Sequence, residues 1–165
     1  MFTRGRVGDF GMTAAVPRAL VEAFYKAYAE RDIDRVGEFL ADDVTWTITG
    51  PVDLLRFCGT RQGKAATLDM IGRQISEVYQ VLSFVPDAVL IDGAWVATIN
   101  RLSARLSECE RVISFRLAHF LRFRDGKIVE MRAIIDSYDA VEQVLGQQLA
   151  VPGDIRVGDS RLVAV

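Results

Sequence analysis

Apolar and polar side chains alternate from Ile113 to Phe123 strictly enough to assign two faces, and this pattern limits most strongly how the chain can fold. A period of two is typical of a β-strand that buries one face and exposes the other. The predicted inner face holds Ile113, Phe115, Leu117, His119, Leu121 and Phe123, and the predicted outer face holds Ser114, Arg116, Ala118, Phe120 and Arg122. The only histidine of the chain therefore faces inward.

Turn residues divide the region from Gln80 to Tyr138 into a meander of four long strands. The expected turns lie at Asp92-Gly93, at residues 107–110, and at a three-residue loop of residues 125–127, in which Gly126 takes the left-handed conformation. One shorter strand, Val44 to Ile48, alternates in the same way. Residues 51–62 lack such a period but contain apolar side chains, which indicates a flap over a cavity rather than a surface loop.

Three helices are predicted before the meander. Apolar residues recur at helical spacing in residues 18–30, in a short segment that Asp32 can cap, and in residues 63–79. Because helices and strands do not alternate, a doubly wound sheet is excluded. We therefore predict an α+β fold, in which a curved antiparallel sheet forms a cone around three N-terminal helices and encloses a small-molecule-sized pocket.

Length and charge indicate a single domain with a small-molecule partner. The chain has 165 residues, and its 20 basic residues nearly balance its 22 acidic ones, so neither nucleic acid nor a membrane surface is an expected partner. Residues 17–150 are predicted to form the domain, residues 1–16 a flexible arm and residues 151–165 a tail. No apolar run approaches the length of a membrane helix, and a cytoplasmic location is expected. Cys58 and Cys109 lie in unrelated segments, so free thiols are expected and a metal site is not.

A small polar cluster is predicted inside the cone. The expected turns pair His119 with Thr98 on one neighbouring strand and with Ala133 on the other, and they place Asn100 on the same face. Burial would keep the imidazole neutral at pH 7, so that one nitrogen donates a hydrogen bond and the other accepts one. That state suits an acid/base catalyst, although a purely structural core histidine explains the spacing equally well.

Aromatic residues are the other candidates for the pocket. Tyr25 and Tyr28 belong to the apolar stripe of the first helix, where core packing is the alternative interpretation. The remaining predicted wall residues are Phe24, Trp46, Ile48, Phe57, Phe115 and Ala133. Asp136, at the junction of the last strand and a final short helix, is a candidate catalytic carboxylate, with a helix N-cap as the alternative.

Four phrases occur in an order that resembles a known superfamily. They are AERDIDRVGEFLADDVTW, GPVDLLRFCGTRQG, FRDGKIVEMR and IIDSYDAVEQVLG. Over residues 17–149 the chain resembles the nuclear transport factor 2 superfamily and, within it, the SnoaL-like proteins, which include ketosteroid isomerase. The resemblance implies a cone-shaped domain that dimerises through the outer face of its sheet and holds an acid/base residue deep in the cone.

The catalytic positions of these relatives transfer only in part. Ketosteroid isomerases use an aspartate base, a helix tyrosine and an oxyanion-binding acid. The resemblance implies that these positions correspond in this sequence to Ile48, to Phe24 and to His119 or Ala118. In the SnoaL-like cyclases, the nearest match to the catalytic aspartate is Asp136. Ketosteroid isomerisation by the known mechanism is not expected, because Ile48 cannot act as a base.

Two functions follow as hypotheses. The first is a cofactor-independent isomerase, cyclase or dehydratase-type lyase that moves protons on an apolar substrate with His119 as acid/base. The second is a non-catalytic domain that binds an apolar ligand or dimerises.

Overall fold

The computed structural model describes residues 15–150. Its helices are α1 (Arg18–Glu30), α2 (Ile33–Phe39), α3 (Lys64–Asp69), α4 (Ile75–Val78) and α5 (Ser137–Leu145), and a π-helical segment, η1 (Met70–Gln74), joins α3 to α4. Its strands are β1 (Leu40–Thr49), β2 (Gly59–Gln62), β3 (Tyr79–Asp92), β4 (Trp95–Leu106), β5 (Val112–Arg124) and β6 (Lys127–Ile135). The expected α+β class is confirmed.

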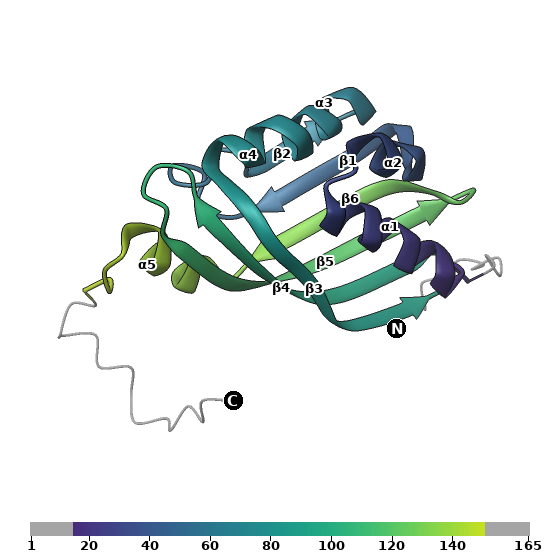
Figure 1. Cartoon of the computed structure of the whole chain (residues 1–165). Helices are drawn as coiled ribbons and strands as arrows, with labels where there is room; N and C mark the ends of the chain where they lie inside the picture. Colours follow the sequence, from purple (N-terminus) through teal and green to yellow (C-terminus); the bar gives the residue numbers. More distant parts are fainter. Residues whose placement is uncertain (1–14, 151–165) are drawn as a thin grey trace, which may run out of the picture.

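The six strands form one curved, open sheet in the order β2-β1-β6-β5-β4-β3. Figure 1 shows α1, α2 and the α3–α4 helix on one side of this sheet, with α5 at one end of it. All neighbouring strands are antiparallel except β1 and β6, which are parallel. The expected all-antiparallel sheet therefore needs this one correction.

The flap predicted at residues 51–62 ends in a strand, β2, that the sequence pattern does not reveal. It pairs with β1, and the hydroxyls of Thr47 and Thr60 lie 3.0 Å apart across the pair. This edge strand has no buried side chain, so it lacks the apolar alternation by which a strand is recognised. The strand predicted from Val44 to Ile48 is also longer, because β1 begins at Leu40.

The hairpin between β5 and β6 differs from its prediction at the turn but not at the site. The turn contains two residues, Asp125 and Gly126, both with positive φ, instead of three. A bulge follows, since Arg122 pairs with Glu130 but Phe123 pairs with Ile128. The extra residue of this bulge, Val129, offsets the shorter turn, so His119 still faces Ala133, as predicted.

Helix α1 lays one apolar stripe on the concave face of the sheet. Val21, Phe24, Tyr25 and Tyr28 are all buried, and the helix ends at Arg31, which adopts the left-handed conformation. The predicted cap of α2 is confirmed, because the Asp32 carboxylate accepts a hydrogen bond from the Arg35 N–H at 3.0 Å.

The packed chain begins slightly earlier than the predicted boundary at residue 17. Val16 is buried, and its N–H donates to the carbonyl of Gly93 at 2.9 Å. Most of the predicted arm (residues 1–14) and all of the predicted tail (residues 151–165) lie outside the described residues. Within residues 15–150, no helix is both long and apolar enough to cross a membrane.

Candidate functional site

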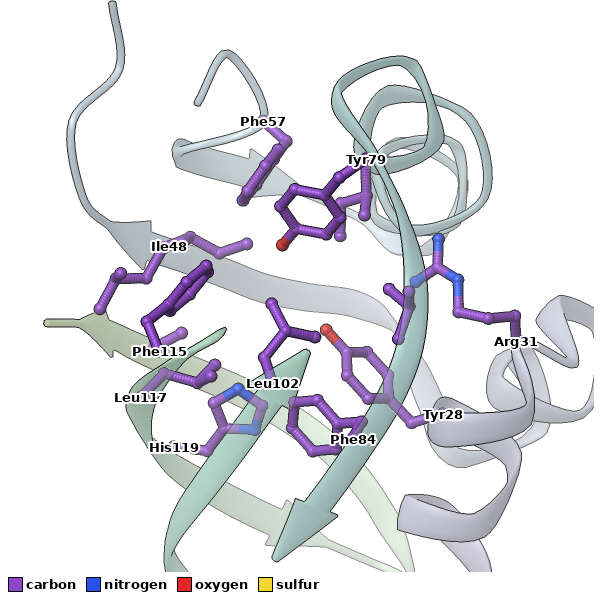
Figure 2. A pocket seen from close by; sticks show the side chains of 14 residues that line it. Tyr28, Arg31, Ile48, Phe57, Tyr79, Phe84, Leu102, Phe115, Leu117 and His119 are labelled. Atoms are coloured by element: carbon purple, nitrogen blue, oxygen red, sulfur yellow. The ribbon is translucent and has the colours of Figure 1, made fainter. Parts of the chain in front are cut away.

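A small cavity lies between the concave face of the sheet and the helices (Figure 2). Its volume is about 30 Å³, which is room for one or two water molecules. The lining residues are Tyr28, Arg31, Ile48, Phe57, Ile75, Tyr79, Val81, Phe84, Leu102, Phe115, Leu117, His119, Ala133 and Ile135. The cavity is much smaller than the ligand-sized pocket expected from the sequence, because aromatic rings fill most of the space. Phe57 and Tyr79, for example, meet edge to face with ring centroids 5.4 Å apart.

A chain of buried hydrogen bonds runs beneath the cavity and ends at His119. The amide Nδ2 of Asn100 donates to Oγ1 of Thr98 at 2.8 Å. The hydroxyl of Tyr25 lies 2.8 Å from the same Oγ1 and 3.2 Å from Nδ1 of His119. All four side chains are at most 5% exposed. The predicted polar cluster of Thr98, Asn100 and His119 is thus brought together, with Tyr25 as its central link.

Matching each donor of this hydrogen-bond chain with an acceptor shows which atoms carry the protons. The Asn100 amide is oriented by a second bond from Nδ2 to the carbonyl of Leu117 at 3.4 Å. Thr98 already accepts from this amide, so the one acceptor for its own proton among its described partners is the Tyr25 oxygen. The Tyr25 proton then goes to Nδ1 of His119. A neutral imidazole that accepts at Nδ1 carries its hydrogen on Nε2.

Both ends of the chain lack a partner among the described residues: Oδ1 of Asn100, and Nε2 of His119, whose residue alone of the two lines the cavity. Nε2 is fully buried and has no hydrogen bond with any described residue. Desolvation lowers the pKa of His119 from 6.5 to about 3, so the ring is neutral at physiological pH. An unpaired buried N–H costs about 1–3 kcal/mol, which a ligand oxygen at this position would recover.

A second group of polar side chains, those of Arg31, Tyr28 and Tyr79, lines the cavity. Arg31 reaches it from the end of α1, and the hydroxyls of Tyr28 and Tyr79 point into it (Figure 2). Burial raises the pKa of both tyrosines, while the positive charge of Arg31 acts in the opposite direction. Within the described chain, the tyrosine hydroxyls that form hydrogen bonds are those of Tyr25 and Tyr138. The hydroxyls of Tyr28 and Tyr79 are therefore left to face the cavity.

The predicted wall residues divide into two groups. Those that line the cavity are Tyr28, Ile48, Phe57, Phe115 and Ala133. Phe24 and Trp46 are completely buried but lie in the core behind Tyr28, whose ring centroid is 5.7 Å from that of Phe24 and 6.1 Å from that of Trp46. They support the cavity rather than form its surface.

Asp136 lies away from His119. It is exposed and occupies the N-cap position of α5, although its side chain makes no capping hydrogen bond. It borders an outer groove with Arg101 and Arg116 instead of the inner cavity. The structure therefore does not group Asp136 with the imidazole, and we do not retain it as a partner of His119.

Arg31, Tyr79 and Phe84 line the cavity, but the sequence pattern did not identify them. Arg31 and Tyr79 occupy the ends of elements, where helical periodicity no longer applies. Phe84 lies on β3, which contains two register shifts that disturb its alternation. An isolated arginine between two amphipathic helices was the one available signal for Arg31.

Metal ligands do not gather in the part of the chain that the structure describes. Residues 15–150 contain no group of three or more His, Cys, Asp or Glu side chains placed to hold a metal ion. The cavity lining also contains no aspartate or glutamate. Its polar chemistry is therefore that of one imidazole, two phenols and one guanidinium.

Several solved structures share this architecture. A candidate isomerase from Rhodopseudomonas palustris is 31% identical over 78% of this chain and 94% of its own, with a TM-score of 0.68. An LEH-like epoxide hydrolase from M. tuberculosis is 23% identical over 78% of this chain and 88% of its own, with a TM-score of 0.62. A protein from Catenulispora acidiphila with a ketosteroid isomerase-like fold, in complex with trimethylamine, is 15% identical over 79% of this chain and 94% of its own, with a TM-score of 0.65. No functionally curated protein matches the sequence significantly.

The family model for the SnoaL-like domain matches residues 21–131. This span begins in α1, ends in β6 and contains Tyr25, Thr98, Asn100 and His119. It therefore includes every residue of the buried hydrogen-bond chain. The order of elements, the cone-shaped sheet and this match agree, and the chain belongs to the SnoaL-like domain family of the nuclear transport factor 2 fold.

Proposed function

We propose that this protein binds a small, mostly apolar organic molecule in the cavity, with an oxygen of the ligand accepting a hydrogen bond from Nε2 of His119. One observation carries the proposal: the only unpaired polar atom of the imidazole points into an otherwise largely apolar space. A buried donor of this kind favours a ligand that carries an acceptor and rejects an analogue that lacks one.

Binding requires the cavity to widen. Its present volume of about 30 Å³ is well below that of a ring-sized molecule. Phe57 lies in the loop between β1 and β2, so it can move without breaking the pairing of β5 with its neighbours. We infer that Phe57 turns aside when a ligand enters.

A matched pair of fragments tests this function. Acetophenone carries a carbonyl oxygen, whereas ethylbenzene has nearly the same shape and no acceptor. In NMR titrations, acetophenone should shift the His119 Nε2 resonance and bind at least tenfold more weakly to His119→Leu, while ethylbenzene should bind both proteins alike. Equal binding of the two fragments to the wild-type protein, or no binding of acetophenone, would refute the proposal.

Catalysis is the second candidate, and the similarity to a candidate isomerase favours it. In such a reaction His119 would polarise a substrate carbonyl through its Nε2–H. Complete loss of that proton would leave negative charge on the imidazole or on Tyr25, whose pKa is raised by burial, so polarisation is the more favourable role. The reaction would be a cofactor-independent isomerisation, cyclisation or dehydration.

Proton exchange distinguishes an enzyme from a binding domain. If the site polarises a bound ketone, a methyl proton of acetophenone passes more readily to a water molecule in the cavity, so the wild-type protein should accelerate exchange of these hydrogens with D2O. His119→Leu should abolish the acceleration. Tight binding without any acceleration would assign the domain a non-catalytic role.

We also propose that two copies associate through the outer face of the sheet. Trp95, Ile99, Phe120 and Ile134 are between 41% and 51% exposed there. Ala118 pairs with Ile99 on one side and Ile134 on the other, so this apolar patch is continuous across three strands. Light scattering at micromolar concentration should give a dimer, and Phe120→Glu should give a monomer. A wild-type monomer would refute the proposal.

A cytoplasmic location is part of the same proposal. Cys58 and Cys109 are free thiols, which are typical of a reducing compartment. Burial also raises the pKa of Cys58 to about 11, so its thiol stays protonated and unreactive at neutral pH.

A further inference from the structure

Arg31 is the one positively charged side chain that lines the cavity. Among the described residues it forms no ion pair with a carboxylate, whereas eight such pairs occur elsewhere on the protein. A guanidinium beside a largely apolar cavity, with no acidic partner, is suited to receive an anionic group of a ligand.

The backbone around Arg31 holds its guanidinium in this position. Arg31 has φ 60° and ψ 28°, and its N–H closes α1 on the carbonyls of Ala27 and Tyr28. The guanidinium donates through Nη2 to the carbonyl of Ile71 in the π-helical segment η1. In that segment the N–H of Ile75 bonds to Met70, one residue further back than in an α-helix, so it leaves the Ile71 carbonyl to other donors.

Two more donors converge on the same region. The hydroxyls of Tyr28 and Tyr79 point into the cavity (Figure 2), and Arg31 is close enough to both for its positive charge to oppose the rise in their pKa. Both residues are less than 10% exposed. Arg31, Tyr28 and Tyr79, from the end of α1, from its last turn and from the start of β3, thus line the same cavity and can donate to an oxyanion bound there.

We infer that the ligand is an acidic molecule: an apolar body that carries a carboxylate, which binds Arg31, Tyr28 and Tyr79, and a second, uncharged oxygen, which binds His119. This inference rests on the proposed function, since it names the class of ligand for the same cavity. Small aromatic or alicyclic keto acids have this distribution of groups.

Matched probes test the carboxylate requirement separately from binding itself. The probes are 3- and 4-acetylbenzoate, with the corresponding acetylbenzamides as uncharged analogues and acetophenone as the parent compound. On the wild-type protein at low salt, one of the benzoates should bind at least tenfold more tightly than its amide. Arg31→Gln should remove this preference by weakening the binding of the benzoate much more than that of the amide, whereas Arg31→Lys should keep part of it.

Lys26→Gln is the control variant. Lys26 is exposed on α1, so its substitution changes the net charge by the same amount without touching the cavity, and the preference should persist. Thermal unfolding of each variant checks that the loss of the bond to Ile71 has not disrupted the fold.

The outcomes separate the two proposals. If acetophenone binds but the benzoates gain no affinity over the amides, or if Arg31→Gln keeps the preference, the acidic ligand class is wrong while the binding function stands. If acetophenone fails to bind, the binding function is refuted and the inference with it.

Discussion

The hydroxyl of Tyr25 lies 3.2 Å from Nδ1 of His119, so helix α1 orients an imidazole that strand β5 carries. The two residues are 94 positions apart in the sequence. Their contact closes the helix layer onto the sheet and leaves Nε2 for the cavity. The predictions below concern this contact and the groups around it.

His119 should remain neutral in the folded protein down to about pH 4. Burial lowers its pKa from 6.5 to about 3, and because it is the only histidine its NMR signals are unambiguous. ¹⁵N shifts should show a hydrogen on Nε2 and a bare Nδ1 from pH 8 to pH 4. Titration of His119 near pH 6.5 in the folded protein would contradict the burial of this side chain.

The same shift predicts how stability depends on pH. Below pH 6.5 the unfolded chain binds a proton at His119 that the folded protein excludes until about pH 3. The contribution of the neutral imidazole is therefore complete above pH 6.5 and is lost as pH falls across this window, by roughly 1.4 kcal/mol per pH unit. The free energies of unfolding of the wild-type protein and of His119→Leu, measured with urea at several pH values, should differ by about this amount in their slope against pH. Parallel pH profiles would contradict the prediction.

Thr98→Val should weaken the buried chain at its centre. The substitution keeps the shape but removes the hydroxyl that links Asn100 to Tyr25, leaving polar groups without a partner at a cost of about 1–3 kcal/mol. Without the Thr98 hydroxyl, the Tyr25 oxygen can accept a hydrogen bond from Nδ1–H instead of donating to Nδ1. NMR should therefore show a mixture of the two His119 tautomers. Thr49→Val, on an exposed strand position, should change neither quantity.

Phe57→Leu should open the cavity. The smaller side chain removes the edge-to-face contact with Tyr79 and should raise the affinity for acetophenone severalfold, at a cost of about 1–2 kcal/mol of stability. Phe123→Leu is the matched control, because Phe123 is equally buried but does not line the cavity. It should lose similar stability without a gain in affinity. Equal affinities in both variants would show that Phe57 does not control entry.

Two glycines should respond in opposite directions to alanine. A Cβ at Gly50 would lie 2.8 Å from Sγ of Cys58 and 3.1 Å from Cδ1 of Ile135, so Gly50→Ala should destabilise by about 1–3 kcal/mol. A Cβ at Gly72 would make an ordinary contact with Ile33 at 3.4 Å, so Gly72→Ala should be neutral or stabilise by up to about 1 kcal/mol. Thermal unfolding measures both, and a stabilised Gly50→Ala would contradict this close packing just after the end of β1.

The sequence predicts the surroundings of His119 better than those of Arg31 and Tyr79. Alternation along β5 fixes the face of His119, and strand pairing follows from the turns, so Thr98 and Ala133 are correctly placed beside it. Even the misjudged hairpin turn does not move His119, because the bulge at Val129 restores the register. Arg31 and Tyr79 come from element ends and meet only through tertiary packing, which no local period encodes. The cavity volume depends on ring rotamers, and residue spacing does not determine those.

The two polar groups of the cavity rest on partly different supports, and the π-helical segment belongs to only one of them. The His119 group rests on β4, β5 and the middle of α1, whereas the Arg31 group rests on the C-terminus of α1, η1 and the first residue of β3. A substitution in η1 that removes the bond from Arg31 leaves in place the strand pairing and the Tyr25 contact that hold His119. Changes in η1 can therefore alter which charged group the protein prefers while the imidazole keeps its position, so that charge preference is separable from the chemistry of His119.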